Sequence, residues 1–180
     1  MDNSNITRTV NVSEIERKYL IESINKGSAW EREFIIFQWF LNEFENETKI
    51  KVIFDLHSLS QKWVRVSKNR KSDEEAEKVV DYLDSTTIEC RSFLGRPFVC
   101  KRRSIIKDMH LDYFIEANPK DIYMLEVEGD QSDVSLLQDQ FLLKLGDDVT
   151  SNISYRNINM GVNFQEDNLS KFLFLQKMFQ

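Results

Sequence analysis

SEIERKYLI, residues Ser13 to Ile21, is the stretch that decides the predicted fold. It places Glu14, Glu16 and Lys18 at alternate positions and ends in an apolar run. In a β-strand the side chains at positions i, i+2 and i+4 point to the same face. The stretch therefore predicts a strand, close to the start of the chain, that carries two carboxylates and an ammonium on one face.

The composition indicates a folded protein with a sizeable core. The chain has 180 residues, of which 12% are aromatic, with only five Gly and two Pro. This amount of apolar mass suits one domain, so we expect a single domain over residues 1–180 with a helical tail at 147–180. The longest apolar cluster, FIIFQWFL (34–41), is too short to span a bilayer, and no membrane partner is expected.

Charge and cysteine content narrow the class of protein further. The N-terminal residues MDNSNITRTV contain no apolar core of a secretory signal. Two cysteines are too few for a disulfide scaffold or a zinc knuckle, so we expect reduced thiols and a cytoplasmic location. The formal net charge of −6 speaks against a nucleic-acid partner.

Short alternating or β-rich runs dominate the chain and predict about eight strands. These candidate strands are residues 14–21, 37–44, 49–56, 62–67, 86–94, 98–107, 110–116 and 122–129. Capping residues and a helical period predict three helices, at 72–84, 132–146 and 166–179. We therefore predict an α+β, β-dominated fold with flanking α-helices, in which a mostly antiparallel sheet of about eight strands can close into a barrel.

Charged residues recur with period two along six of the predicted strands, opposite a more apolar face. Besides the opening stretch, these residues are Lys49, Lys51, Arg65, Glu89, Arg91, Lys101, Arg103, Asp112, Glu126 and Glu128. On any single strand, a face exposed to solvent explains the charges equally well. Acidic pairs at both ends and basic pairs between them favour a barrel whose interior is lined with charge.

Several of these stretches, in the same order, resemble the CYTH family of triphosphate tunnel metalloenzymes. EIERKYLI resembles the opening E-x-E-x-K motif, and MLEVEG resembles the closing strand with its E-V-E. FQWFLN, KRRSII and MHLDYF resemble internal strands, and DVTSNISYRNIN resembles the V-T…Y-x-N segment of the bacterial subgroup. The resemblance covers most of residues 14 to 160 and implies a closed eight-stranded antiparallel β-barrel with a charged lumen.

The chain also departs from the family pattern in the middle of the site. No R-x-E-x-E strand is identifiable, and the V-R-x-R strand has only KIKVI or VRVSK as counterparts. His110 stands where a glutamate is common, and Ser104 stands in place of a tyrosine.

The resemblance implies roles for individual residues. Glu14, Glu16 and Lys18 would be catalytic, and Mg²⁺ or Mn²⁺ would be held by Glu14, Glu16, Glu126 and Glu128. Such hard cations prefer oxygen ligands. Phosphate oxygens would be bound by Lys18, Lys51, Arg65, Arg91, Lys101 and Arg103, and the site would also include Asp112 and Tyr155.

We therefore expect a divalent metal-dependent phosphohydrolase that acts on a linear triphosphate, either inorganic triphosphate or the tail of an organic one. Its partner would be a triphosphate-containing small molecule, and the C-terminal helical segment could also pack on a second subunit in a homodimer. One alternative is an adenylate cyclase, which binds ATP in a similar tunnel and expels pyrophosphate. Another is a non-catalytic protein that binds a triphosphate or nucleotide.

Overall fold

The structure is a computed structural model of the chain. It describes residues 6–24, 31–41, 46–72, 75–85, 88–106, 109–128 and 143–179. Within these ranges most residues lie in strands. The first half contains β1 (Ile6–Ser23), β2 (Arg32–Phe40), β3 (Asn46–Asp55), β4 (Ser60–Arg70) and β5 (Glu75–Leu83). The second half contains the short 3₁₀ helix η2 (Cys90–Phe93), β6 (Pro97–Ile106), β7 (Met109–Glu116), β8 (Tyr123–Glu128), β9 (Lys144–Asp148), the 3₁₀ helix η3 (Ile153–Tyr155), β10 (Val162–Asn163) and α2 (Glu166–Met178).

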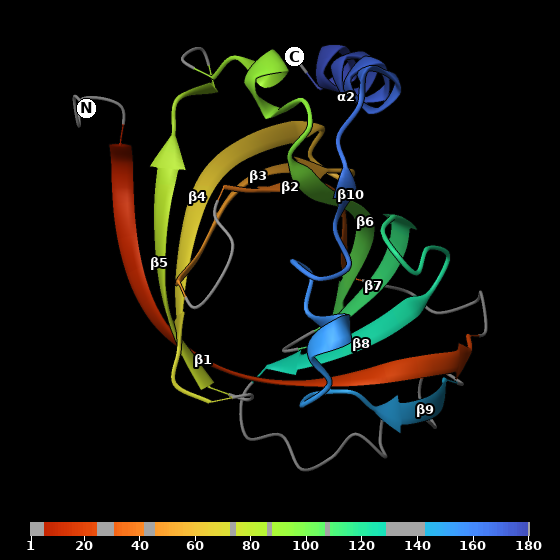
Figure 1. The fold of residues 1–180 in the computed structure, drawn as a ribbon. Coiled ribbons are helices and arrows are strands. Elements are labelled where there is room, and N and C mark those ends of the chain that lie inside the picture. The colour runs from red at the N-terminus through yellow and green to blue at the C-terminus, as the bar shows by residue number, and fades with distance from the viewer. Residues whose placement is uncertain are drawn as a thin grey trace.

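The strands form one antiparallel sheet that curls round, so that one of its faces is turned inward (Figure 1). The order is β10-β6-β2-β3-β4-β5-β1-β8-β7, and β6 also pairs with β7. The long first strand β1 pairs with β5 along its first half and with β8 along its second half. The prediction of a β-dominated, mostly antiparallel fold with a C-terminal helix is confirmed. None of the helices described is long and apolar enough to cross a membrane.

The helix predicted at 72–84 is wrong, because residues 75–83 form the strand β5. Ala76, Val79, Val80 and Leu83 fit a helical period, but β5 is hydrogen-bonded on both sides, to β4 and to β1. Valine also suits a pleated strand. Pairing with two neighbouring strands therefore overrides the local helical pattern.

The strand predicted at 86–94 is also wrong over its described residues. Residues 90–93 form η2, in which the Ser92 hydroxyl donates to the Glu89 carbonyl at 2.7 Å. Gly95 follows with a positive φ of 78°, a conformation that glycine adopts without strain. Most of the helix predicted at 132–146 lies outside the described residues, but its last residues, Lys144 to Gly146, belong to β9.

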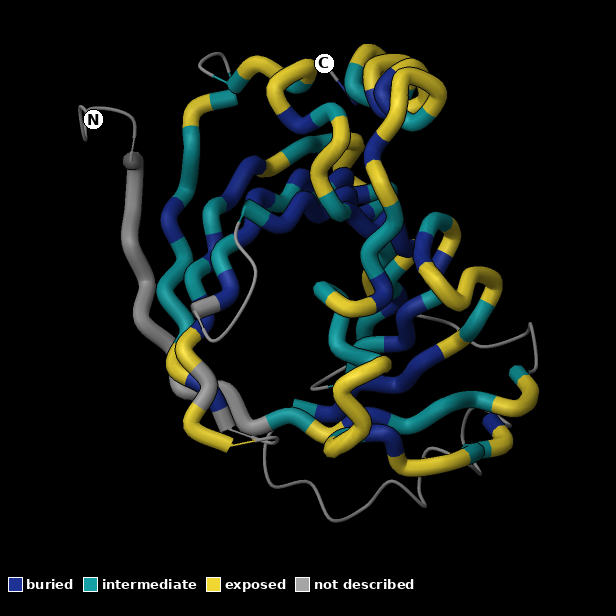
Figure 2. Tube along the Cα trace, viewed as in Figure 1, coloured by how far each residue is buried: buried dark blue, intermediate teal, exposed yellow. Residues whose placement is uncertain are grey.

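The helix predicted at 166–179 is confirmed as α2, and it packs on the outer face of the sheet. Of the tail predicted to be helical at 147–180, only this part is α-helical; η3 and β10 precede it. Its buried Phe172 contacts the rings of Phe37, Trp39, Phe54 and Trp63. Figure 2 shows buried strands beneath the helix and exposed residues on its far side. The aromatic core therefore lies outside the curled sheet, which leaves its inner face to other residues.

Part of the inner face is apolar as well. At one end, one apolar side chain from each of five strands packs against residues of the 149–160 segment. These side chains are Leu20, Phe40, Val99, Phe114 and Met124. Figure 1 shows this segment inside the curled sheet, beside β8. Residues of the 149–160 segment thus fill this end of the interior, next to these five strands.

We expect Phe172→Ala to lower the free energy of unfolding by about 3–5 kcal/mol, because it removes a fully buried ring that four other rings contact. Phe174, on the same helix, is 66% exposed, so Phe174→Ala should change stability by less than about 0.5 kcal/mol. Urea unfolding followed by tryptophan fluorescence measures both. Equal losses would contradict the packing of α2 described above.

Candidate functional site

Strand alternation turns a set of charged side chains toward the interior. Basic residues at this site come from β1, β3, β4, β5 and β6, and acidic residues come from β1, β3 and β8. Seven basic and four acidic residues line it: Lys18, Lys49, Lys51, Lys68, Lys78, Lys101, Arg103, Glu16, Glu47, Glu126 and Glu128. Among the described side chains that line the site, positive charge therefore exceeds negative charge.

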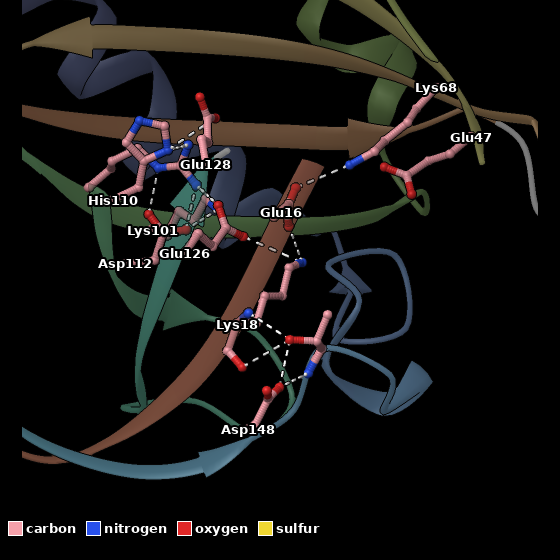
Figure 3. A network of polar contacts seen from close by, with 12 residues as sticks. Glu16, Lys18, Glu47, Lys68, Lys101, His110, Asp112, Glu126, Glu128 and Asp148 are labelled. Carbon is pink, nitrogen blue, oxygen red and sulfur yellow. Dashed lines mark hydrogen bonds and ion pairs between the residues drawn. The ribbon is translucent and has the colours of Figure 1, made fainter. Parts of the chain in front are cut away.

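The opening stretch lies beside the closing strand, as the sequence predicts. In the antiparallel pairing of β1 with β8, Glu16 lies opposite Glu128 and Lys18 lies opposite Glu126. The Lys18 ammonium is 2.8 Å from Glu16 Oε1 and 3.4 Å from Glu126 Oε1. The other carboxylate oxygen of Glu16 accepts a hydrogen bond of 3.2 Å from Lys68 (Figure 3). Glu14 pairs with Ala76 through its backbone, and its side chain is outside the described ones.

A second network centres on Asp112, whose side chain is completely buried. Arg103 donates to both of its carboxylate oxygens, at 2.6 Å each, and Lys101 donates to Oδ2. Arg103 also donates to Glu126, which joins this network to Lys18 and Glu16. One connected set of ion pairs thus runs through the interior (Figure 3).

The ion pairs keep both kinds of group charged despite burial. Burial alone would raise the pKa of Glu126, but the positive charges of Lys101 and Arg103 hold that pKa well below its usual value. Burial would lower the pKa of Arg103, but the charges of Asp112 and Glu126 raise it well above the usual value. Each charge is therefore stable only because its partners are present.

His110 occupies the position at which the sequence departs from the family pattern. Its Nδ1 lies 3.1 Å from Arg103 Nη1 and 3.4 Å from Glu128 Oε1. Burial, followed by the positive charge of Arg103, lowers the pKa of His110 to about 4. The imidazole is thus neutral at pH 7, and it places a neutral group where a carboxylate is common.

Lys51 differs from the other interior cations. It makes no ion pair with any residue in the described part of the chain. Burial, together with the positive charges of Lys49 and Arg103, lowers the pKa of its ammonium well below the usual value. An anion bound in the interior would relieve this repulsion, so a negative charge beside Lys51 is favoured.

The segment after β9 holds the opening strand in place. Val149 donates its N–H to the Lys18 carbonyl at 2.9 Å, and the Lys18 N–H donates to Thr150 Oγ1 at 2.9 Å. The Thr150 hydroxyl donates to Asp148 at 2.6 Å. Tyr155 packs in the apolar end of the interior and Asn157 lines the charged part, so the V-T…Y-x-N segment contacts the site along its length.

Two residues predicted to bind phosphate lie away from this interior. Arg65 alternates with Val64 and Val66, which face inward. On the opposite face of the sheet its Nε and Nη2 both donate to Asp81 Oδ2, at 2.9 Å and 2.6 Å. Arg91 lies in η2 and pairs with Glu166 of α2 at 3.1 Å. Their predicted placement in the interior is wrong. The side chain of Arg65 points to the outer face of its strand, and residues 90–93 do not form a strand.

Several interior residues are not recognisable from the sequence pattern. Lys68 lies in the basic run KNRK, which is typical of a solvated turn, and Lys78 lies in the stretch predicted as a helix. Continuing the alternation of Lys49 and Lys51 back by two residues would have found Glu47, which pairs with Lys49. Gln38 is fully buried opposite Lys51, and neither polar atom of its side chain has a hydrogen-bond partner among the described residues.

The acidic side chains match a divalent cation in chemical type, because Mg²⁺ takes carboxylate oxygens. Among the side chains described, however, no group of three His, Cys, Asp or Glu residues converges closely enough to hold a metal. Glu16 and Glu126 are bound to lysine and arginine instead. Since Mg²⁺ commonly uses one or two carboxylates together with substrate phosphates, these residues fit a metal that binds along with an anion.

Comparison with solved structures identifies proteins of the same architecture. One is titled "The crystal structure of the inorganic triphosphatase NE1496", and it matches with a TM-score of 0.51 and 22% identity, covering 86% of this chain and 97% of that one. The chain shares the fold of this triphosphatase. A second, titled as the hypothetical protein NE1496, has a TM-score of 0.51 and 21% identity and covers 84% of this chain and 99% of that one. No protein-family model and no curated protein matches the sequence.

We expect Asp112→Asn to lower the free energy of unfolding by about 3–5 kcal/mol, because it leaves Lys101 and Arg103 buried with less compensation. Glu166→Gln breaks an ion pair whose two side chains are each 65% exposed, and it should cost less than about 0.5 kcal/mol. Denaturant unfolding at pH 7 compares the two variants. A small loss for Asp112→Asn would show that the interior network contributes little to stability.

Proposed function

We propose that the chain is a divalent metal-dependent phosphohydrolase that acts on a linear triphosphate bound inside the curled sheet. The observation that carries this proposal is the interior in which basic residues outnumber acidic ones and Lys51 has no ion-pair partner among the described residues. Such a site favours a compact ligand with several negative charges. The name printed for the structure of similar fold, an inorganic triphosphatase, agrees with this ligand.

The proposal includes the closed eight-stranded barrel predicted from the sequence. The pairing of β6 with β7, added to the order of the other strands, supports it. In that arrangement the charged residues of β1, β3, β4, β5, β6 and β8 surround the ligand on all sides. Lys18, Lys51, Lys101 and Arg103 remain the proposed phosphate ligands from the sequence analysis, joined by Lys49, Lys68 and Lys78.

Ligand binding exchanges partners within the interior. A triphosphate draws ammonium groups such as Lys18 and Lys68 from Glu16, because phosphate oxygens accept strong charge-assisted hydrogen bonds. The carboxylates of Glu16, Glu126 and Glu128 would then hold Mg²⁺ or Mn²⁺, which would supply charge neutralisation and lower the pKa of a bound water. Glu14 belongs to the same proposed set through its place on β1.

The chemical step is hydrolysis of a phosphoanhydride. Water attacks the terminal phosphorus, the bond from that phosphorus to the bridging oxygen breaks, and a carboxylate of the site accepts the proton of the water. The products are phosphate and a diphosphate. Arg103 and the lysines stabilise the negative charge on the transferred group, and Arg103 is itself held in place by Asp112.

A second candidate function is binding without turnover. It is favoured by the absence of a preassembled group of three metal ligands among the described side chains and by the neutral His110 beside Glu128. An adenylate cyclase is the third candidate and uses the same kind of ligand.

Product analysis separates these functions. The purified chain is incubated with inorganic tripolyphosphate or ATP, with Mg²⁺, Mn²⁺ or a chelator. Release of phosphate that the chelator abolishes supports the hydrolase, and cyclic AMP from ATP would support the cyclase. Binding of tripolyphosphate with no product under either metal would overturn hydrolysis and leave the binding protein.

We expect Glu16→Gln to reduce metal-dependent phosphate release roughly 100-fold, with partial recovery at high Mn²⁺ concentration. Because Glu16 binds both Lys18 and Lys68, the variant should also lose about 1–3 kcal/mol of stability. Glu89→Gln, at an exposed position before η2, is the control and should keep both properties. Unchanged activity of Glu16→Gln would remove this carboxylate from the proposed machinery.

Lys51→Met should weaken tripolyphosphate binding about tenfold or more, because it removes a charged phosphate donor. The same change should raise the stability of the ligand-free protein by roughly 1 kcal/mol, because it removes repulsion from Lys49 and Arg103. Calorimetric titration and urea unfolding measure the two effects, with exposed Lys120→Met as control. Lower stability without weaker binding would contradict the role of Lys51.

A further inference from the structure

Gln38 on β2 is a buried polar side chain that the ion-pair network does not include. It is fully buried, and neither its amide nitrogen nor its amide oxygen has a hydrogen-bond partner among the described residues. Few buried polar atoms in folded proteins stay without a partner, and each one that does destabilises the fold. The amide of Gln38 therefore points to a second arrangement, in which it is hydrogen-bonded.

The surroundings of Gln38 contain one polar residue directly opposite it. In the pairing of β2 with β3 Gln38 lies opposite Lys51, and in the pairing of β2 with β6 it lies opposite Val99. Ile36 and Phe40 flank it on the same face of β2. Directly opposite residues of an antiparallel pair have Cβ atoms about 5 Å apart, so side-chain rotation brings the Gln38 amide and the Lys51 ammonium within hydrogen-bond distance.

Lys51 differs from two other interior lysines in what faces it. Lys49 pairs with Glu47, and Lys101 pairs with Asp112. Lys51 makes no ion pair with any residue in the described ranges, and it lies opposite a neutral amide instead. An amide oxygen accepts a hydrogen bond without adding a negative charge. The positive charge of Lys51 is therefore not neutralised by its neighbour on β2 and stays available to an anion.

Anion binding creates a need for this acceptor. An ammonium has three N–H donors, and a phosphate in front of Lys51 takes one or two of them. A donor that is left over in a dry interior needs an acceptor, because an unmade hydrogen bond there is costly. Gln38 is fully buried and is not among the described side chains that line the site, so it acts on an anion through Lys51.

We propose that Gln38 is a positioning residue of the anion site: its amide oxygen accepts a hydrogen bond from the Lys51 ammonium when a polyphosphate is bound. This bond directs the other donors of Lys51 toward the phosphate oxygens. The proposal rests on the proposed function and adds to it the residue that orients one of its cations. The unsatisfied amide destabilises the ligand-free protein, and the anion-bound protein gains the hydrogen bond.

Gln38→Met tests the proposal, because it replaces the amide with an unbranched apolar group of similar length. Calorimetric titration of the whole chain with inorganic tripolyphosphate, without metal, should show about tenfold weaker binding, since Lys51 loses the acceptor that orients it. The urea midpoint of the ligand-free variant should rise, because unsatisfied polar atoms leave a buried position. A glutamine that only stabilised the fold would instead give a lower midpoint.

Gln61→Met is the matched control. The Gln61 amide oxygen is also buried without a hydrogen-bond partner in the described part of the chain. Gln61 lies opposite Phe54, whose ring contacts Phe172 of α2 on the outer face of the sheet. Gln61→Met should therefore leave the affinity for tripolyphosphate unchanged.

A double-mutant cycle with Lys51→Met separates positioning from an independent effect. If Gln38 acts through Lys51, then adding Gln38→Met to Lys51→Met should weaken tripolyphosphate binding no further. Gln38→Leu provides a second apolar variant for the same cycle should Gln38→Met fail to fold.

The possible failures are distinguishable. Unchanged affinity in Gln38→Met and Gln38→Leu, or the same loss with and without Lys51, would overturn the positioning role, while tripolyphosphate binding by the wild-type chain would uphold the charged site. Absence of tripolyphosphate binding by the wild-type chain would overturn the proposed function as well.

Discussion

The rest of the interior depends on the ion pairs that the buried Asp112 carboxylate makes with Lys101 and Arg103. Lys101 and Arg103 are two residues apart on one strand and share the inward face. Each positive charge therefore makes the burial of the other less favourable. Asp112, opposite Arg103 on the neighbouring strand, offsets both, and Arg103 then reaches Glu126. The strands can keep so many charges on an inner face only because these pairs are connected across β6, β7, β8 and β1.

Alternation along strands made much of this predictable. Glu16, Lys18, Lys101, Arg103 and Glu126 were assigned to one face from the period of two alone, and the pairing of the first strand with the last follows from the resemblance. The β-dominated fold is predictable for the same reason, and the C-terminal helix is predictable from its capping residues and helical period. The alternation of faces follows from the geometry of a single strand. The prediction of which side chains share a face therefore holds wherever the strand is correctly predicted.

Other parts of the site depend on information that is not local. Arg65 has strand periodicity but the opposite parity, and only the register with Asp81 on β5 reveals that it faces outward. Lys78 was hidden because its stretch also matches a helical period, and the pairing of β5 with both β1 and β4 decides between the two. The ion pair of Glu16 with Lys68 joins strands that are distant in sequence, so no single stretch encodes it.

The pairing of β1 with β5, β8 and β9 has a consequence for how the chain folds during synthesis. Its first half can pair with β5 once residue 83 is available, but its second half, which carries Glu16 and Lys18, pairs with residues 124–128. The acidic and basic side chains of the N-terminal strand therefore remain hydrated while most of the chain is made. Because Lys18 and Lys68 are made before Glu126, part of the ion-pair network can form early. The dehydration of Glu16 and Lys18 is complete only when β8 pairs with β1.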